Sequence, residues 1–488
     1  MLRKRNEVMF NYGSLAITKR PFMSRKKTGI LRYIAEIIIK NKSLLTENEE
    51  LNRQNERLAR EVDKYRDLLS RVNPVESPVR LMAEKKHSLI RFRSATVLYA
   101  DVLGFEHFSP NTDTKHIVDS LDAIFIRLQG IIRKFEVKNI RTIGDSLMCV
   151  GGIPHKNITN TIEVLLAAVE MRYYFNDLQR TGEVNQIWKL RIGIHTGTVV
   201  ANVSGRKKPH YDVKGDTVNL AARIRQFCED GDILISATTY ELVKDLFHCE
   251  YYNKMPVKYQ GEIPLYTVKS IKPEFSLQGK GIIPNKRFSV RYGMIQFTDL
   301  QEIILDKLEK ELPHSLYYHN VKHTMDVVTQ VELIGLGEGV EDEDLLLLKT
   351  AALFHDTGHT LSYDNHEYFS CLVARETLPE YYYTTSQIDT ICDLIMATKL
   401  PPRPLNKLEE IMCDADLDYL GRSDMIPVSN TLFQELRERS MIKSLNDWNT
   451  LQMKFISGHQ YFTETARKLR EVNKQLQIER IRSLIVKE

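Results

Sequence analysis

Ser94-Ala-Thr-Val-Leu-Tyr-Ala-Asp101 is a run of apolar and β-branched residues that ends on a carboxylate. Such a run predicts a buried strand. Helical and strand-like patterns then alternate, with helices expected over 117–135 and 163–178 and a hairpin around Gly144-Asp145. The alternation predicts a domain in which helices cover a sheet, extending over 90–271.

Residues 34–72, upstream of this domain, carry a heptad repeat of Ile and Leu with Asn at three a positions (Asn41, Asn48 and Asn55). Heptads kept in one register predict a coiled coil, and Asn at a favours a parallel, two-stranded one. A single amphipathic helix packed on its own domain is the alternative.

Residues 1–33 form a basic segment, with nine Lys or Arg and one acid in its first 32 positions. We expect a flexible, solvated tail, and a contact with an anionic membrane is less favoured. The whole chain of 488 residues has a net charge of only +4, which indicates no specific nucleic-acid partner.

Residues 272–296 contain Pro273, Gly279, Gly281 and Pro284 and are expected to form a linker. Residues 297–488 show helical periodicity and predict an all-α domain. The six cysteines are scattered without a C-x-x-C pair, and no window offers the 18 or so apolar residues of a membrane span. We therefore expect a cytoplasmic, multidomain protein.

Two further segments accompany Asp101 and Asp145, namely Arg191-Ile-Gly-Ile-His-Thr-Gly197 and Tyr211-Asp-Val-Lys-Gly-Asp-Thr-Val-Asn-Leu-Ala-Ala-Arg223. In order and spacing the four segments resemble the catalytic domain of class III nucleotidyl cyclases, the adenylyl and guanylyl cyclases. The resemblance implies a ferredoxin-like α+β fold and formation of a 3′,5′-cyclic nucleotide.

That reaction needs the ribose 3′ oxygen to attack the α-phosphate, which two divalent cations about 3.5–4 Å apart assist. Mg²⁺ or Mn²⁺ prefers carboxylate oxygens, and Asp101 and Asp145 would supply them. The resemblance implies that Asn219 and Arg223 orient the ribose and stabilise the reacting phosphate. It also implies that Lys258 holds the terminal phosphates.

Arg141 and Asp212 occupy the positions that choose the base in this family. Arginine only donates hydrogen bonds and an ionised aspartate only accepts them, a pair that fits the amino group and ring nitrogen of adenine. Cytosine shows the same pattern, so CTP stays open, but ATP is the expected substrate. In the family the site lies between two cyclase domains, and this chain has one. We therefore expect a homodimer, which the coiled coil would hold together.

The helical domain carries Tyr318-His-Asn-Val-Lys-His323, then His355-Asp356 and a later Asp416. The order of these residues resembles the metal ligands of HD-superfamily phosphohydrolases, and imidazole with carboxylate suits Mn²⁺, Fe or Zn²⁺. Asp416 is a better candidate than Asp414 or Asp418.

The opening motif also resembles cyclic nucleotide phosphodiesterases, in which the first histidine, here His319, protonates the leaving oxygen. His359 and His366 are candidates for extending the site towards a second metal. Many HD proteins have a further histidine where this chain has Thr398, which leaves a two-metal site open.

The leading hypothesis is a dimeric adenylate cyclase fused to a metal-dependent hydrolase of phosphoesters, with a cyclic nucleotide as one candidate substrate. One alternative is a hydrolase whose cyclase domain only senses nucleotide. The other is a cyclase that a non-catalytic, metal-bound HD domain regulates.

Overall fold

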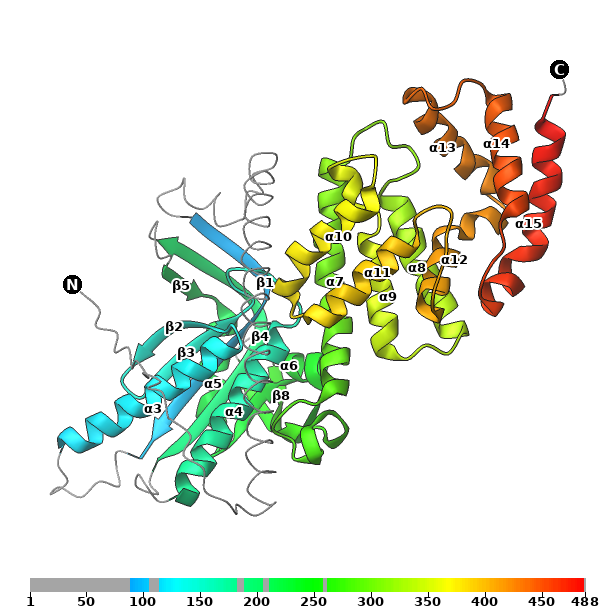
Figure 1. Ribbon diagram of the computed structural model, residues 1–488. Helices are drawn as coiled ribbons and strands as arrows, with labels where there is room; N and C mark the ends of the chain where they lie inside the picture. The colour runs from blue at the N-terminus through cyan, green and yellow to red at the C-terminus, as the bar shows by residue number, and fades with distance from the viewer. Residues whose placement is uncertain (1–87, 105–113, 182–187, 205–209, 258–260, 487–488) are drawn as a thin grey trace, which may run out of the picture. The chain divides into compact units, whose positions relative to one another are not determined.

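The structure is a computed structural model that describes residues 88–104, 114–181, 188–204, 210–257 and 261–486 (Figure 1). The predicted basic tail and coiled coil, over 1–33 and 34–72, lie outside these residues. Among the described helices, none is both long and apolar enough to cross a membrane.

The first part of the described chain is built on one eight-stranded sheet. Its strands are β1 (Ser88–Leu103), β2 (Lys138–Ile143), β3 (Ser146–Gly151), β4 (Lys189–Ser204), β5 (His210–Lys214), β6 (Ile233–Ser236), β7 (Phe247–Val257) and β8 (Gly261–Ile271). They run in the order β2-β3-β1-β4-β6-β8-β7, and β5 pairs with β4. β4 and β6 are parallel, whereas the other pairs are antiparallel. The predicted strand at 94–101 and the hairpin at Gly144-Asp145 are therefore both present.

Helices cover both faces of this sheet. α3 (Thr114–Lys134) and α4 (Asn160–Thr181) bury Leu128 and Leu165 in one core cluster with Ile233 and Ile235 of β6. α5 (Asp216–Phe227) buries Leu220 and Ile224 in a second cluster with Leu234 of the same strand. Because successive strand residues point to opposite faces, α5 lies on the other side of the sheet from α3 and α4. α6 (Ala237–Val243) follows β6 directly.

Gly193 of β4 allows α5 to approach the sheet closely. A Cβ atom at this position would lie 2.2 Å from the backbone nitrogen of Arg225 and 2.8 Å from the carbonyl oxygen of Ala221. Only glycine leaves room for that contact. The backbone of α5 is thereby held against β4, next to the strand that carries Asp101.

The remaining chain is helical. It comprises α7 (Lys286–Glu311), α8 (Val321–Gly337), α9 (Asp342–Phe354), α10 (His366–Thr377), α11 (Thr385–Ala397), α12 (Lys407–Asp416), α13 (Met425–Glu438), α14 (Leu445–Gly458) and α15 (Glu464–Leu484). Helices α7 to α12 enclose a large apolar cluster. α7 begins at Lys286, inside the segment expected to be linker, because the Asn285 side chain caps it by accepting a hydrogen bond from the Phe288 N–H at 3.1 Å.

Candidate functional sites

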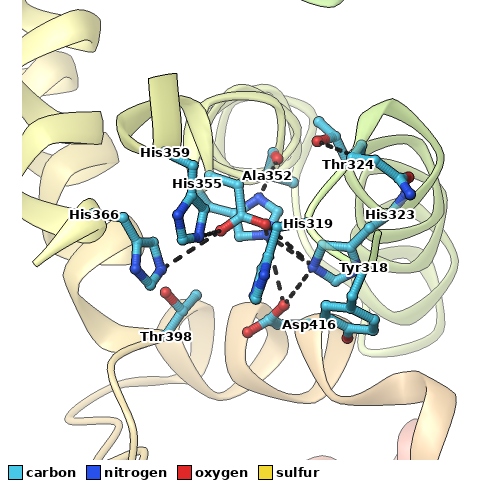
Figure 2. A network of polar contacts seen from close by, with 12 residues as sticks. Tyr318, His319, His323, Thr324, Ala352, His355, His359, His366, Thr398 and Asp416 are labelled. Carbon is cyan, nitrogen blue, oxygen red and sulfur yellow. Dashed lines mark hydrogen bonds and ion pairs between the residues drawn. The ribbon is translucent and has the colours of Figure 1, made fainter. Parts of the chain in front are cut away.

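Four candidate metal ligands of the helical part meet at one point. His323 lies in the first turn of α8, His355 and Asp356 directly follow α9, and Asp416 ends α12. His323 Nε2 lies 3.2 Å from Asp416 Oδ1, 3.4 Å from Asp356 Oδ2 and 3.3 Å from His355 Nε2. His355 Nε2 lies 3.2 Å from Asp356 Oδ2 and 3.6 Å from Asp416 Oδ1. Figure 2 shows the two imidazoles and the Asp416 carboxylate directed at one another.

The ligand atoms of His323, His355 and Asp356 lie close enough together to share one metal ion, and Asp416 Oδ1 lies beside the two imidazoles. Ligand atoms about 2.1 Å from a tetrahedral metal would lie about 3.4 Å from each other. His355 Nδ1 lies 2.8 Å from the carbonyl oxygen of Ala352, and an N–H there leaves the Nε2 lone pair for the metal. The buried Asp356 Oδ2 has no hydrogen-bond partner among the described residues. The donor set therefore fits a divalent transition metal.

The carboxylates of this cluster are held ionised. Burial acts to raise the pKa of Asp416, but hydrogen bonds with His323 and His355 outweigh it and hold the pKa well below its usual range. Burial likewise acts to raise the pKa of Asp356, but the positive charge of a protonated His355 outweighs it and lowers that pKa. An ionised carboxylate is the form that binds a metal, so both side chains are ready ligands.

Asp414 and Asp418, the aspartates on either side of Asp416, form hydrogen bonds outside the cluster. Asp414 accepts hydrogen bonds from the backbone N–H groups of Phe462 and Thr463 at 2.9 and 2.8 Å. Asp418 pairs with Arg470 at 2.6 Å. Among the three aspartates of this segment, Asp416 is therefore the one that the structure places against His323 and His355.

Glu435 of α13 is a residue of the site that the sequence analysis missed. Its Oε1 lies 2.6 Å from His319 Nδ1, and its Oε2 accepts from the backbone N–H groups of Tyr318 and His319 at 3.0 and 3.3 Å. Burial acts to lower the pKa of His319, but the hydrogen bond to Glu435 and the charge of Asp356 raise it overall. His319 is thereby favoured in its protonated form, which can donate a proton.

His359 and His366 stack beside the same cluster, with ring centroids 4.0 Å apart. Their Nε2 atoms lie 3.9 and 3.6 Å from Asp356 Oδ1, and Figure 2 shows both rings on one side of the site. Burial lowers the pKa of His359 to about 2, so this ring stays neutral. The Thr398 hydroxyl donates to the Ile395 carbonyl oxygen at 2.8 Å.

A cavity of about 490 Å³ opens onto this cluster and is lined by His319, Asp356 and Asp416 on one side. Trp448, Gln452 and Phe455 of α14 also line it. The buried Trp448 Nε1 and Gln452 Oε1 find no hydrogen-bond partner within the described part of the chain. Aromatic side chains thus form part of the cavity lining. No motif marks α14, so this cavity could not be predicted from the sequence.

In the sheet part, Asp101 and Asp145 come from adjacent backbone segments. Asp101 lies near the end of β1, and Asp145 lies in the turn between β2 and β3, where its carbonyl oxygen accepts from the Val102 N–H at 2.9 Å. Asp101 Oδ1 accepts hydrogen bonds from Ser146 Oγ at 2.5 Å and Arg225 Nη1 at 2.8 Å. The two aspartates are thus carried on adjoining backbone, and carboxylate oxygens are the ligands that Mg²⁺ or Mn²⁺ prefers.

Asn219 and Arg223 lie on a different side of α5 from Arg225. Arg223 Nη2 donates to the carbonyl oxygen of Pro256 in β7 at 2.7 Å, whereas Arg225 reaches Asp101. Helix residues are about 100° apart, so Arg225 points some 200° away from Arg223. The structure therefore does not bring Asn219 and Arg223 to the aspartates of the same chain. Lys258 lies outside the described residues.

The two candidate base-selecting residues do come together. Arg141 of β2 and Asp212 of β5 form an ion pair, with Arg141 Nη2 3.1 Å from Asp212 Oδ1. Lys214 Nζ lies 2.9 Å from the other oxygen, Asp212 Oδ2. The Arg141 and Asp212 side chains keep 50% and 31% of their surface exposed, so a ligand can reach both.

Comparison with known protein families gives two matches. A family described as adenylate and guanylate cyclase catalytic domain matches residues 88–270, and the HD domain family matches residues 320–418.

Similar proteins include two guanylate cyclases. The receptor-type guanylate cyclase gcy-8 of Caenorhabditis elegans is 31% identical over 189 residues, 38% of this chain and 16% of that protein. Guanylate cyclase soluble subunit beta-2 of Homo sapiens is 32% identical over 211 residues, 43% of this chain and 34% of that protein. These matches thus span about a third or less of the relatives' length.

Solved structures similar to the chain include the guanylate cyclase domain of RhGC from Catenaria anguillulae in complex with GTP. It is 30% identical, with 38% of this chain and all of that chain covered and a TM-score of 0.34. The adenylyl cyclase CyaB from P. aeruginosa is 25% identical, with 38% of this chain and 96% of that chain covered and a TM-score of 0.35.

Proposed function

We propose that this chain, which combines a class III nucleotidyl cyclase catalytic domain with an HD domain, converts ATP to 3′,5′-cyclic AMP and pyrophosphate. The observation that carries the choice of ATP is the ion pair between Arg141 and Asp212. An acceptor beside a donor matches the amino group and ring nitrogen of adenine, whereas guanine offers the opposite pattern. Among the similar proteins named above, gcy-8 and the soluble subunit beta-2 are guanylate cyclases, so GTP is the competitor that a test must include.

Each cyclase residue has a role in this proposal. Asp101 and Asp145 hold two Mg²⁺ or Mn²⁺ ions, which supply charge to activate the 3′ oxygen and to stabilise the pyrophosphate. Asn219 orients the ribose, Arg223 stabilises the charge on the reacting phosphate, and Lys258 binds the terminal phosphates.

The same proposal requires two copies of the chain. α5 directs Arg225 at Asp101 and therefore directs Asn219 and Arg223 away from it. A second copy would have to bring its own Asn219 and Arg223 to the aspartates of the first. The heptads of 34–72 support a parallel homodimer. We also place the protein in the cytoplasm, because the cysteines of the described part are free thiols.

The test is incubation of purified protein with Mn²⁺ or Mg²⁺ and ATP, GTP, CTP or UTP in turn, with products resolved by chromatography. We expect a cyclic product from ATP, at a rate at least about tenfold above that from GTP. A preference for GTP would contradict the base assignment but leave the cyclase in place. No cyclic product from any nucleotide would contradict the cyclase itself.

We propose further that the HD domain hydrolyses a phosphoester, with a 3′,5′-cyclic nucleotide as the candidate substrate. The observation that supports this is the cluster of His323, His355, Asp356 and Asp416, in which each histidine lies 3.2–3.6 Å from both carboxylates, next to a cavity of about 490 Å³. A divalent metal held by these residues would supply hydroxide near neutral pH and would polarise a phosphoryl oxygen. His319, protonated and oriented by Glu435, donates a proton to the leaving oxygen.

A second candidate function for the HD domain is metal-dependent regulation of the cyclase. It is favoured by helix α7, whose residues enter both core clusters, Phe288 in the first and Phe297 in the second. The paired variant His355→Ala/Asp356→Ala separates the two functions. We expect cyclic AMP to decay to 5′-AMP with wild type and to persist with the variant. If wild type does not degrade cyclic AMP, and the variant cyclises ATP at a different rate from wild type, regulation would be favoured.

A further inference from the structure

Arg225 contacts the carboxylate that the cyclase needs for metal binding. Its Nη1 atom donates to Asp101 Oδ1 at 2.8 Å and to Ser146 Oγ at 3.1 Å, while Ser146 Oγ donates to the same Asp101 oxygen at 2.5 Å. One oxygen of Asp101 thus already accepts two hydrogen bonds, and one donor carries a full positive charge.

The position of this guanidinium is fixed from several sides. The backbone of Arg225 lies against Gly193 of β4, where a Cβ atom would come within 2.6 Å of the Arg225 Cα. Its guanidinium carbon lies 5.4 Å from the centroid of the Tyr99 ring. Only 17% of the Arg225 side chain and 15% of the Asp101 side chain are exposed. Water and salt therefore screen the pair weakly.

A positive charge held at this place opposes a divalent cation in two ways. It repels the cation, and it occupies the carboxylate oxygen that the cation would otherwise share. We propose that Arg225 competes with Mg²⁺ or Mn²⁺ at the cyclase site and thereby sets the metal concentration at which the cyclase becomes active. The proposal rests on the proposed cyclase function.

A supporting role and a competing role for Arg225 predict opposite changes in metal affinity when Arg225 is removed. If Arg225 merely oriented Asp101 as a ligand, its removal would weaken metal binding. If it competes, its removal strengthens metal binding, provided that Ser146 still holds Asp101. The direction of the change in metal affinity therefore separates the two roles, and loss of structure alone would not produce tighter binding.

The experiment measures Mn²⁺ affinity in the full chain by electron paramagnetic resonance of free Mn²⁺, with 3′-deoxy-ATP present because it lacks the attacking oxygen. The background carries His355→Ala/Asp356→Ala, so that the HD cluster does not bind Mn²⁺. We expect Arg225→Gln to lower the dissociation constant at least about tenfold. Arg225→Lys keeps the charge, so its dissociation constant for Mn²⁺ should stay within about threefold of the wild-type value.

Arg375→Gln is the matched control, because it removes an arginine that pairs with Asp389 at 2.6 Å in the helical part. It should leave Mn²⁺ affinity unchanged. In the wild-type background, Arg225→Gln should also shift half-maximal cyclisation to lower Mg²⁺ concentrations. Circular dichroism and the melting temperature check that each variant is folded.

An unchanged or weaker Mn²⁺ affinity in folded Arg225→Gln would overturn this proposal. Failure of the underlying cyclase proposal looks different. In that case the substitutions Asp101→Ala/Asp145→Ala would leave the Mn²⁺ affinity unchanged, both with Arg225 and with Arg225→Gln.

Discussion

The two halves of the molecule build their sites in different ways. In the helical half, residues of α8 and α12 and two residues that directly follow α9 bring their ligand atoms together within a single chain. In the sheet half, one chain places its aspartates on one side of α5 and its Asn219 and Arg223 on another. A complete set of motif residues in one sequence thus does not mean a complete site in one chain.

The largest effect that tests this difference is expected from Asp145→Ala. Removing one of two carboxylate ligands should lower the cyclisation rate by about 10³-fold or more. Because the HD cluster is built from other elements, its metal content and hydrolysis should not change. Cyclisation is measured as cyclic product per minute, and metal content by mass spectrometry. A parallel loss of HD metal would show that the two sites are not independent.

An intermediate effect is expected from Glu435→Gln, which keeps the shape of the side chain but removes its charge. Glu435 raises the pKa of His319, and the protonated imidazole is the form that donates the proton. Without the charge of Glu435 the pKa of His319 falls. As the pH is raised, the variant should therefore lose hydrolysis at a lower pH than wild type does. We expect kcat at neutral pH to fall about 10- to 100-fold.

The measurement is the pH profile of kcat/KM for phosphoester hydrolysis. Glu438→Gln is the control, since Glu438 lies on the same helix and accepts from the Tyr317 hydroxyl at 2.7 Å, away from His319. An unshifted alkaline limb in Glu435→Gln would contradict the role given to Glu435.

The smallest effect concerns the framework that holds the helical half together. Glu338 pairs with Lys407 and accepts from the Thr465 N–H at 2.7 Å. Burial opposes ionisation, but these partners outweigh it and lower the pKa of Glu338 to about 2. Its stabilisation is therefore present above the unfolded pKa of about 4.3 and is lost as the pH falls towards 2.

Glu338→Gln should lower the free energy of unfolding by about 1 kcal/mol at pH 7, after allowance for solvent screening. Urea denaturation measures the difference, which should shrink as the pH approaches 3. Glu464→Gln removes an exposed pair with Lys468 and should change nothing measurable. A constant difference across this pH range would mean that Glu338 acts through packing rather than charge.

Motif residues could be placed from the sequence because short-range patterns carry them. The strand that ends near Asp101 and the hairpin at Asp145 follow from local periodicity and turn residues. The ligand set His323, His355-Asp356 and Asp416 was predicted from its resemblance to HD-superfamily phosphohydrolases. The start of α7 was misjudged, since Pro and Gly upstream of Asn285 indicated a linker where a side-chain cap begins the helix.

Glu435 and Arg225 could not be found in this way. Glu435 is 116 residues from His319 and lies on a helix without a motif. Arg225 follows a motif residue by two positions, and only the close packing of α5 at Gly193 directs it to Asp101. Both depend on tertiary contacts, which no local pattern encodes.

The most direct test of the account mixes two inactive chains, Asp145→Ala and Arg223→Ala, by co-expression or by refolding together. If each cyclase site takes its aspartates from one chain and its Arg223 from the other, one site of every mixed dimer is intact. Random pairing then restores about a quarter of the wild-type cyclisation rate. No recovery in a preparation shown to contain mixed dimers would contradict a site shared between two chains.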